Sequence, residues 1–191
     1  MLLNIKFDVL GRHINMILRA IKQKDNLLYG VGNRCNDASY ILFLDYDNTP
    51  LDWVTEEIRL LQRRYNTKLG TAYLFKTRKG IHALFLEKND IDDIIEMMRI
   101  TSSDKQHKEI PLYYGRRIWV LRGSPKKDEE LMYLGCLTSL GTTQSVMRSN
   151  AHKKYLQLLY TIPESDFYRG SGFDDENELT LAYYHVGKDD A

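Results

Sequence analysis

The sequence predicts a mixed α+β fold with a partly antiparallel sheet and flanking helices, and three observations carry this prediction. Residues 41–49 read ILFLDYDNT, an apolar run typical of a buried strand. Two apolar runs, 71–75 and 81–86, are joined by a short polar segment, as in an antiparallel hairpin. Apolar residues at helical spacing occupy 52–65 and recur after Asp90. Hairpin strands alternating with helices favour a mixed sheet over a doubly wound parallel one.

The first element is predicted to be an amphipathic helix over about residues 7–23. Its apolar residues recur every three or four positions, at Val9, Leu10, Ile14, Ile17, Leu18 and Ile21. A Gly- and Asn-rich connection, Gly30 to Asn36, then leads to a strand expected over 40–46.

The two central helices are predicted from their apolar stripes. The helix over 52–65 presents Val54, Ile58, Leu61 and Tyr65 on one face. Asp90 is expected to cap the next helix, which carries Ile91, Ile94, Ile95 and Met98.

The pattern is weaker toward the C-terminus. We expect a strand over 117–121, a helix over 150–160, a polar loop over 164–178, a last strand over 179–186 and a frayed tail. The predicted division is a core of residues 1–130, including the N-terminal helix, and an extension of residues 131–191 packed on that core.

Composition limits the classes of function. A chain of 191 residues with net charge +1 can bury a core but predicts no generally basic or acidic partner, so nucleic-acid binding requires local patches. The two cysteines, Cys35 and Cys136, have neither zinc spacing nor a disulfide framework. This fits a reducing, cytoplasmic location. No apolar run approaches the roughly 18 residues of a membrane span, so no membrane association is expected.

The first chemical signal is the pair Asp45 and Asp47 at the end of the apolar run. Residues two apart in a strand share a face, so the two carboxylates are expected to lie side by side. Like charges leaving a buried strand need compensation, and carboxylate oxygens suit Mg²⁺ or Mn²⁺, which in turn suit phosphates. The structural alternative is a turn in which Asp and Asn side chains cap the backbone.

The second signal is the hairpin TRKGIHALFLE, which contains His82. Alone, His82 is best read as a core histidine. Arg78 and Lys79 in the turn, followed by Gly80, favour a phosphate-binding loop instead, because two cations can hold a polyphosphate and a glycine permits close approach.

The third signal is RRIWVLRGSPKK, residues 116–127. Arg117, Ser124 and Lys126 could form a rim that binds phosphate. The structural alternative is a strand whose exposed ends are basic.

Taken in order, these segments resemble the archaeo-eukaryotic primase superfamily, which includes the primase-polymerases of plasmids and viruses. That family has an Asp-x-Asp/Glu motif at a strand end, here FLDYD, and a small-x-His motif in a β-hairpin, here KGIH. The segment RIWVLRGSPK resembles a divergent form of its last motif. The resemblance covers about residues 38–128 and implies an RRM-like palm as the catalytic core. The second motif usually has Ser where this chain has Gly80, whose backbone N–H remains a possible phosphate donor.

The resemblance implies a DNA primase or polymerase, a nucleotidyltransferase acting on a single-stranded DNA template with nucleoside triphosphates. Asp45 and Asp47 would hold Mg²⁺ or Mn²⁺, with Glu109 as the third ligand and Asp104 as its competitor. The nucleotide-binding residues implied are Arg78, Lys79, Gly80, His82, Arg117, Ser124 and Lys126. Candidate template contacts are Arg63, Arg64, Arg116, Arg148, Lys153 and Lys154. A helicase or another replication protein is a further implied partner, and a plasmid or virus a plausible origin.

Two other functions remain open from the sequence. LFLDYDNTPL also resembles the first motif of haloacid-dehalogenase-like phosphatases, which would make Asp45 a nucleophile and Asp47 a general acid. Thr77, Lys126 and the pair Asp174-Asp175 would then take the remaining roles. Alternatively, the same fold with a defective third acid would bind nucleotides or single-stranded DNA without catalysis.

Overall fold

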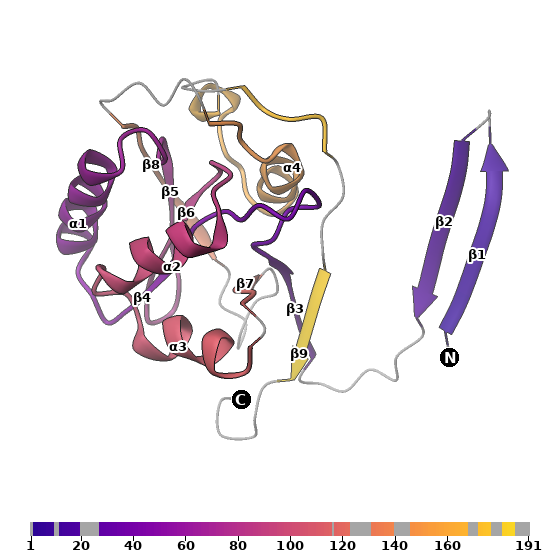
Figure 1. Ribbon diagram of the computed structural model, residues 1–191, viewed down its shortest axis with the longest axis horizontal. Helices are drawn as coiled ribbons and strands as arrows, with labels where there is room; N and C mark the ends of the chain where they lie inside the picture. The colour runs from indigo at the N-terminus through magenta and orange to yellow at the C-terminus, as the bar shows by residue number, and fades with distance from the viewer. Residues whose placement is uncertain are drawn as a thin grey trace. The chain divides into compact units, whose positions relative to one another are not determined.

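The chain forms two compact units, residues 28–183 and a smaller unit of residues 1–27 with 184–191. The structure is a computed structural model that describes residues 2–9, 12–19, 27–115, 117–122, 131–139, 146–167, 172–176 and 181–185. These residues form four α-helices and three antiparallel sheets, so the predicted α+β class is confirmed (Figure 1). The predicted boundary at residue 130 falls outside the described residues.

The N-terminal segment is a β-hairpin, and the helix predicted over 7–23 is wrong. Strand β1 (Leu2–Val9) pairs antiparallel with β2 (Arg12–Arg19), in a register that joins Leu3 to Leu18 and Phe7 to Ile14. The sequence also alternates apolar and other residues from Leu3 to Val9, which is the period of a strand. The helical spacing within this segment was therefore coincidental.

The central sheet of the larger unit has four antiparallel strands in the order β4-β6-β5-β8. They are β4 (Phe43–Asp47), β5 (Ala72–Lys76), β6 (Gly80–Phe85) and β8 (Met132–Leu137). The predicted β5–β6 hairpin is confirmed. Strand β8 was not predicted, and it pairs with β5 through a register shift between Leu74 and Phe75. Strand β4 is left at the opposite edge of the sheet.

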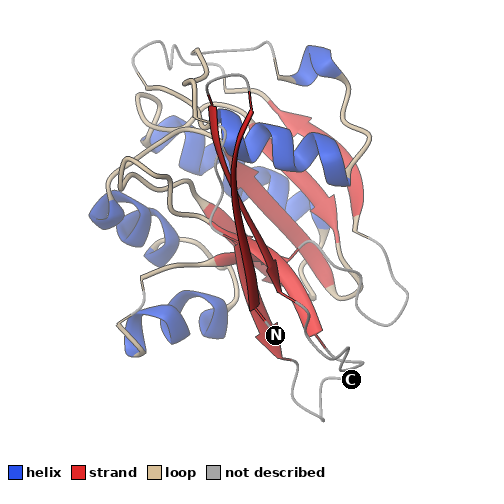
Figure 2. Ribbon diagram, turned by 90° about the vertical axis from the view of Figure 1, so that its right-hand side faces the viewer, coloured by secondary structure: helices blue, strands red, loops and turns tan. Residues whose placement is uncertain are grey.

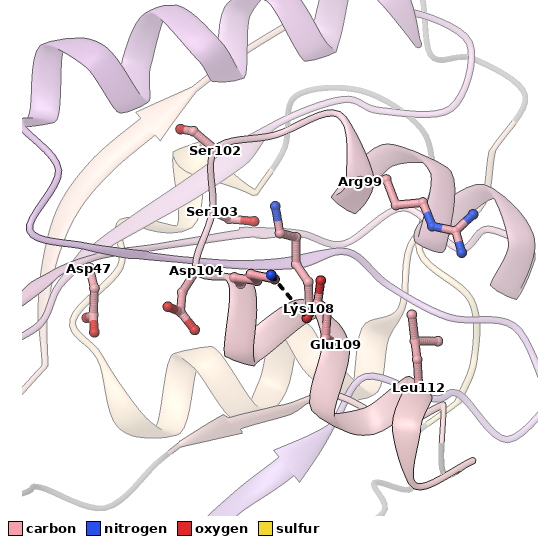
Figure 3. A pocket seen from close by; sticks show the side chains of 9 residues that line it. Asp47, Arg99, Ser102, Ser103, Asp104, Lys108, Glu109 and Leu112 are labelled. Atoms are coloured by element: carbon pink, nitrogen blue, oxygen red, sulfur yellow. Dashed lines mark ion pairs between the residues drawn. The ribbon is translucent and has the colours of Figure 1, made fainter.

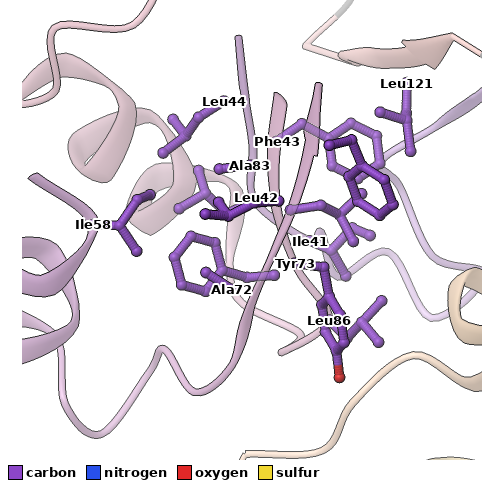
Figure 4. Close-up of a cluster of buried hydrophobic side chains, with 14 of the residues drawn as sticks. Ile41, Leu42, Phe43, Leu44, Ile58, Ala72, Tyr73, Ala83, Leu86 and Leu121 are labelled. Atoms are coloured by element: carbon purple, nitrogen blue, oxygen red, sulfur yellow. The ribbon is translucent and has the colours of Figure 1, made fainter. Parts of the chain in front are cut away.

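Helices cover both faces of this sheet (Figures 1 and 2). Helix α1 (Leu51–Arg64) lies on the Tyr46 face, where the Tyr46 hydroxyl donates to Glu57 at 2.7 Å. Helix α4 (Asn150–Leu159) lies on the Phe43 face, and the Phe43 and His152 rings meet edge to face. Both helices were predicted from the sequence. The core between the layers is continuous, as Figure 4 shows around Ile41, Leu42, Phe43 and Leu44.

Two further helices follow β6. Helix α2 (Ile91–Arg99) was predicted and buries Ile94, Met97 and Met98. Helix α3 (Lys105–Tyr113) was not predicted, because it buries no residue fully and contains Pro111. Proline has no N–H to donate to the carbonyl of His107 four residues earlier. That carbonyl accepts instead from Trp119 Nε1 at 3.0 Å, which ties α3 to the buried Trp119.

A second sheet has the order β7-β3-β9. Its strands are β3 (Leu27–Gly32), β7 (Val120–Arg122) and β9 (Leu181–His185), and a short 3₁₀ helix spans Glu164–Asp166. Strand β7 starts later than predicted because Arg117 has a left-handed φ of 48°. Within the described residues, no helix combines the length and apolar character that crossing a membrane requires.

Candidate functional site: an acidic cluster at the edge of the central sheet

Asp45 and Asp47 lie on the edge strand β4 and face the turn end of the β5–β6 hairpin. Asp45 is directly opposite His82, and Asp47 is opposite Gly80. His82 Nε2 lies 3.3 Å from Asp45 Oδ1, and the two side chains are 14% and 30% exposed. The hairpin thus places its histidine beside the first carboxylate.

The alternation of β4 explains this placement. Leu44 and Tyr46 are buried on the face covered by α1, whereas Asp45 is partly exposed and Asp47 exposed at the strand end. The carboxylates therefore share the other face with Phe43. They leave the core at the point where the sheet ends.

Asp104 is the third acid of the cluster. Its N–H donates to the Asp45 carbonyl at 2.6 Å, and its side chain caps α3 by accepting from the N–H of His107 at 2.7 Å. His107 Nε2 lies 3.4 Å from the Phe43 carbonyl. The start of α3 therefore covers the outer edge of β4, whose carbonyls would otherwise lack partners. The same contacts bring the Asp104 carboxylate to the side of Asp47.

The electrostatics of the cluster are unbalanced. Partial burial, then the charges of Asp45 and Asp104, raise the pKa of Asp47, although Lys79 and His82 act to lower it. Burial lowers the pKa of the nearby His107, so this imidazole is neutral near pH 7 and offsets no negative charge. The side chains around Asp47 thus leave its negative charge under-compensated. We call Asp45, Asp47 and Asp104 the β4 cluster.

A hollow of about 660 Å³ opens beside the β4 cluster (Figure 3). Its lining combines acids, cations and serines: Asp47, Arg99, Ser102, Ser103, Asp104, Lys105, Lys108, Glu109 and Leu112. Glu109 lies further along α3, is 63% exposed and sits 4.0 Å from Lys105. Of the two candidates for a third metal ligand, Asp104 is the one that interacts with Asp47.

The ligand atoms of these acids are not drawn together. Among the described residues, neither Asp104 nor Glu109 forms a group with Asp45 and Asp47 whose ligand atoms all lie within 4.8 Å of one another. A cation bound here would require side-chain rotation or retained water ligands. Mg²⁺ commonly uses only one or two carboxylates and keeps several waters, so the donor set fits it.

The hairpin turn shows why residue 80 is glycine. A Cβ at Gly80 would lie 1.7 Å from the Tyr46 carbonyl oxygen, so the serine usual in the resembled motif cannot fit without a backbone shift. The Gly80 N–H donates to Thr77 Oγ1 at 3.0 Å. This N–H is therefore engaged within the turn, and the side chains of Arg78 and Lys79 are exposed at its tip.

The remaining predicted residues do not all reach the site. Arg117 is exposed in the turn after α3, where its N–H donates to the Pro111 carbonyl at 3.2 Å. Ser124 and Lys126 lie outside the described residues. Arg148, a candidate template contact, is buried, donates to the Phe167 carbonyl and stacks on Phe173. The expectation that Arg148 contacts a template is wrong, because its guanidinium belongs to the interior.

A second acidic group lies elsewhere in the larger unit. Cys35, Asp37 and Glu176 bring ligand atoms within 4.8 Å of one another and could hold a metal ion. However, Lys88 Nζ lies 3.0 Å from both carboxylates and also pairs with Asp174. The lysine ammonium thus already occupies the position of the counter-cation. We call Asp37, Asp174 and Glu176 the Lys88 cluster.

No family model, curated protein or solved structure matches this chain. The site therefore rests on its own geometry. Sequence reasoning placed Asp104 second to Glu109 and did not consider His107. The available signal was the spacing Asp104-x-x-His107, since an Asp can cap a helix by accepting from the N–H three residues later.

Proposed function

We propose that this chain is a metal-dependent nucleotidyltransferase of the primase-polymerase type, with the β4 cluster as its cation site. One observation carries the proposal. Three carboxylates from two elements converge at the end of strand β4, and partial burial followed by the charges of Asp45 and Asp104 raises the pKa of Asp47. When a divalent cation binds to such a cluster, it removes the repulsion between the carboxylates. A cluster of this kind is therefore a candidate cation site.

The order and pairing of the elements support the finer fold prediction, an RRM-like palm. The acidic strand β4, helix α1 and the β5–β6 hairpin follow one another, and β6 lies between β4 and β5. This topology brings the acidic motif and the histidine motif together at one edge, as the resemblance implies.

We assign a different role to each group of side chains in the site. Asp45, Asp47 and Asp104 would hold Mg²⁺ or Mn²⁺, and the bound ion would activate the attacking hydroxyl and neutralise the leaving pyrophosphate. His82, whose Nε2 lies 3.3 Å from Asp45 Oδ1, would place a positive charge beside this carboxylate when its imidazole is protonated. Lys79 and Arg78 extend from the turn toward solvent as donors for the phosphates of a nucleoside triphosphate.

The phosphatase alternative is less well supported. That fold expects its nucleophile on a strand of a parallel sheet, reached by crossover connections. Every pairing of β4, β5 and β6 is antiparallel. Thr77, the required hydroxyl, accepts the Gly80 N–H inside the hairpin turn. Of its acidic pair, Asp174 is engaged with Lys88.

The test is template-dependent incorporation of labelled nucleotides with Mn²⁺ or Mg²⁺ and a single-stranded template. Wild type is compared with Asp45→Asn/Asp47→Asn and with Asp104→Asn, since asparagine still caps a helix but carries no charge. Glu176→Gln, in the Lys88 cluster, is the matched control. We expect products from wild type and the control only.

Two other outcomes would contradict the proposal. Absence of products from folded wild type, with nucleotide binding retained, would make the chain a binding module. Release of phosphate from a generic phosphomonoester, lost in Asp45→Asn, would support the phosphatase.

A further inference from the structure

The end of α3 carries two exposed aromatic side chains. Tyr113 is 84% exposed and Tyr114 is 65% exposed. Their ring centroids lie 5.2 Å apart at an interplanar angle of 88°. Large aromatic rings normally contribute to a core, so an exposed pair offers its faces to a ligand.

Three cations line the hollow beside the β4 cluster. Arg99, Lys105 and Lys108 line the hollow together with Asp47 and Asp104, as Figure 3 shows for Arg99 and Lys108. Lys108 uses one donor on the Thr101 carbonyl at 2.8 Å and keeps two others.

Outside the cluster acids, this surface is basic. Arg117 is exposed in the turn just after the tyrosines. Glu109 is the one acid of the hollow that is not part of the β4 cluster, and it lies near Lys105. Among the described residues, the hollow thus has three cations (Arg99, Lys105 and Lys108) beside its three acids, and Arg117 adds a fourth cation after α3. We call Arg99, Lys105, Lys108, Tyr113, Tyr114 and Arg117 the α3 surface.

The α3 surface is long enough to contact several linked nucleotides. From Asp104 to Tyr113 the helix rises about 1.5 Å per residue, or roughly 14 Å in all. A strand of a few nucleotides would span the length from the carboxylates to the tyrosines. Cations that follow a backbone and aromatic faces that accept bases are the two components of single-stranded nucleic-acid binding.

We propose that the α3 surface binds single-stranded nucleic acid, with phosphates along Arg99, Lys105 and Lys108 and bases stacked on Tyr113 and Tyr114. The inference rests on the proposed function in one respect, namely that the bound strand leads to the β4 cluster. It also replaces the template contacts expected on α1, Arg63 and Arg64, with contacts on α3.

The test measures fluorescence anisotropy of a labelled oligothymidine, in chelator and at two salt concentrations. Tyr113→Ala/Tyr114→Ala should weaken binding at least about tenfold, since one stacked base contributes about 5- to 150-fold. Trp53→Ala removes a 58% exposed aromatic from α1 and should leave affinity unchanged. Arg99→Gln/Lys105→Gln should reduce the salt dependence, by a slope of about one per lost phosphate contact. Arg63→Gln/Arg64→Gln should leave the salt dependence unchanged.

The outcomes separate this inference from the proposed function. Strand binding in chelator should persist in Asp45→Asn/Asp47→Asn, because the α3 surface contains none of the cluster carboxylates. Tyrosine-dependent binding without nucleotide incorporation would remove the proposed function and leave the α3 surface intact. Wild type that does not bind the oligonucleotide, or a tyrosine variant with unchanged affinity, would overturn the inference. The inference would also be overturned if Trp53→Ala weakened oligonucleotide binding as much as the tyrosine variant does.

Discussion

The two acidic clusters of the larger unit differ in what balances their charge. In the Lys88 cluster, a lysine that is only 8% exposed contacts Asp37, Asp174 and Glu176. In the β4 cluster, the side chain beside Asp45 is His82, an imidazole that is charged only when protonated. Both clusters contain three carboxylates, but only the first has a lysine ammonium in contact with all three.

The pKa shifts report this difference directly. Although burial opposes the shift, hydrogen bonds from Ser39 and Lys88 lower the pKa of Asp37. Burial and neighbouring carboxylates raise the pKa of Asp47. The short distances between ligand atoms favour the group around Cys35 as a metal site. The balance of charge in the two clusters favours the β4 cluster instead. Lys88 already serves as the counter-charge of the first group, whereas a bound cation would relieve the repulsion that helps to raise the pKa of Asp47, so we consider the β4 cluster the better candidate.

The largest expected effect is the removal of Lys88. Lys88→Met leaves three carboxylates without their ammonium; loss of one partner of a fully buried ion pair costs about 3 to 5 kcal/mol, and the 49% exposure of Asp37 places this variant at the lower end of that range. We expect a corresponding fall in the free energy of unfolding, measured by denaturant titration at pH 7. A change below about 1 kcal/mol would show that these carboxylates are compensated in some other way.

The Lys88→Met variant also tests whether the Lys88 ammonium prevents metal binding at the group around Cys35. Without the ammonium, Cys35, Asp37 and Glu176 are free to bind a cation that accepts sulfur, such as Cd²⁺ or Zn²⁺. Cd²⁺ should raise the melting temperature of Lys88→Met more than that of wild type. Cys35→Ser in the same background is the control and should abolish the gain.

A second effect concerns Glu87, a buried acid whose negative charge is neutralised by protonation rather than by a cation. Burial raises its pKa to about 7, despite backbone hydrogen bonds and the charge of Arg148. Since the pKa is raised on folding, the stabilisation is fully present below pH 4.5 and is lost as pH rises through about 7. Glu87→Gln should remove this loss and be more stable than wild type at pH 8, by about 3 kcal/mol at most.

Chemical denaturation of both proteins at pH 5 and pH 8 checks this expectation. Near pH 5, where Glu87 is mostly protonated in the folded protein, glutamine is a close mimic and the two stabilities should differ by less than about 1 kcal/mol. Equal stabilities at pH 8 as well would contradict the raised pKa.

The elements predicted correctly are those whose apolar pattern admits one interpretation. Val54, Ile58 and Leu61 fit a helix and no strand, and the tight turn at Gly80 fits a hairpin. The N-terminal segment carried both patterns, because Ile14 and Leu18 satisfy helical spacing while Leu3, Ile5 and Phe7 alternate. Helix α3 was missed since Pro111 interrupts its pattern and Trp119, distant in sequence, supports it.

The candidate site was predictable within a strand or a hairpin but not between elements. The period of β4 placed Asp45 and Asp47 together, and the motif order placed His82 near them. Asp104 depends on a backbone contact between its N–H and the Asp45 carbonyl, which spacing along the chain does not encode. The Lys88 cluster was missed for the same reason, because its carboxylates and Lys88 itself come from three separate segments.

The most direct test of the account is Mn²⁺ binding followed by electron paramagnetic resonance. We predict that wild type and Glu176→Gln bind Mn²⁺ alike, and that Asp47→Asn and Asp104→Asn each weaken binding at least about tenfold. Binding to wild type should also weaken as pH falls through the raised pKa of Asp47, because protonation removes a ligand charge. Loss of Mn²⁺ in Glu176→Gln with full binding in Asp47→Asn would place the cation at the Lys88 cluster and contradict the account.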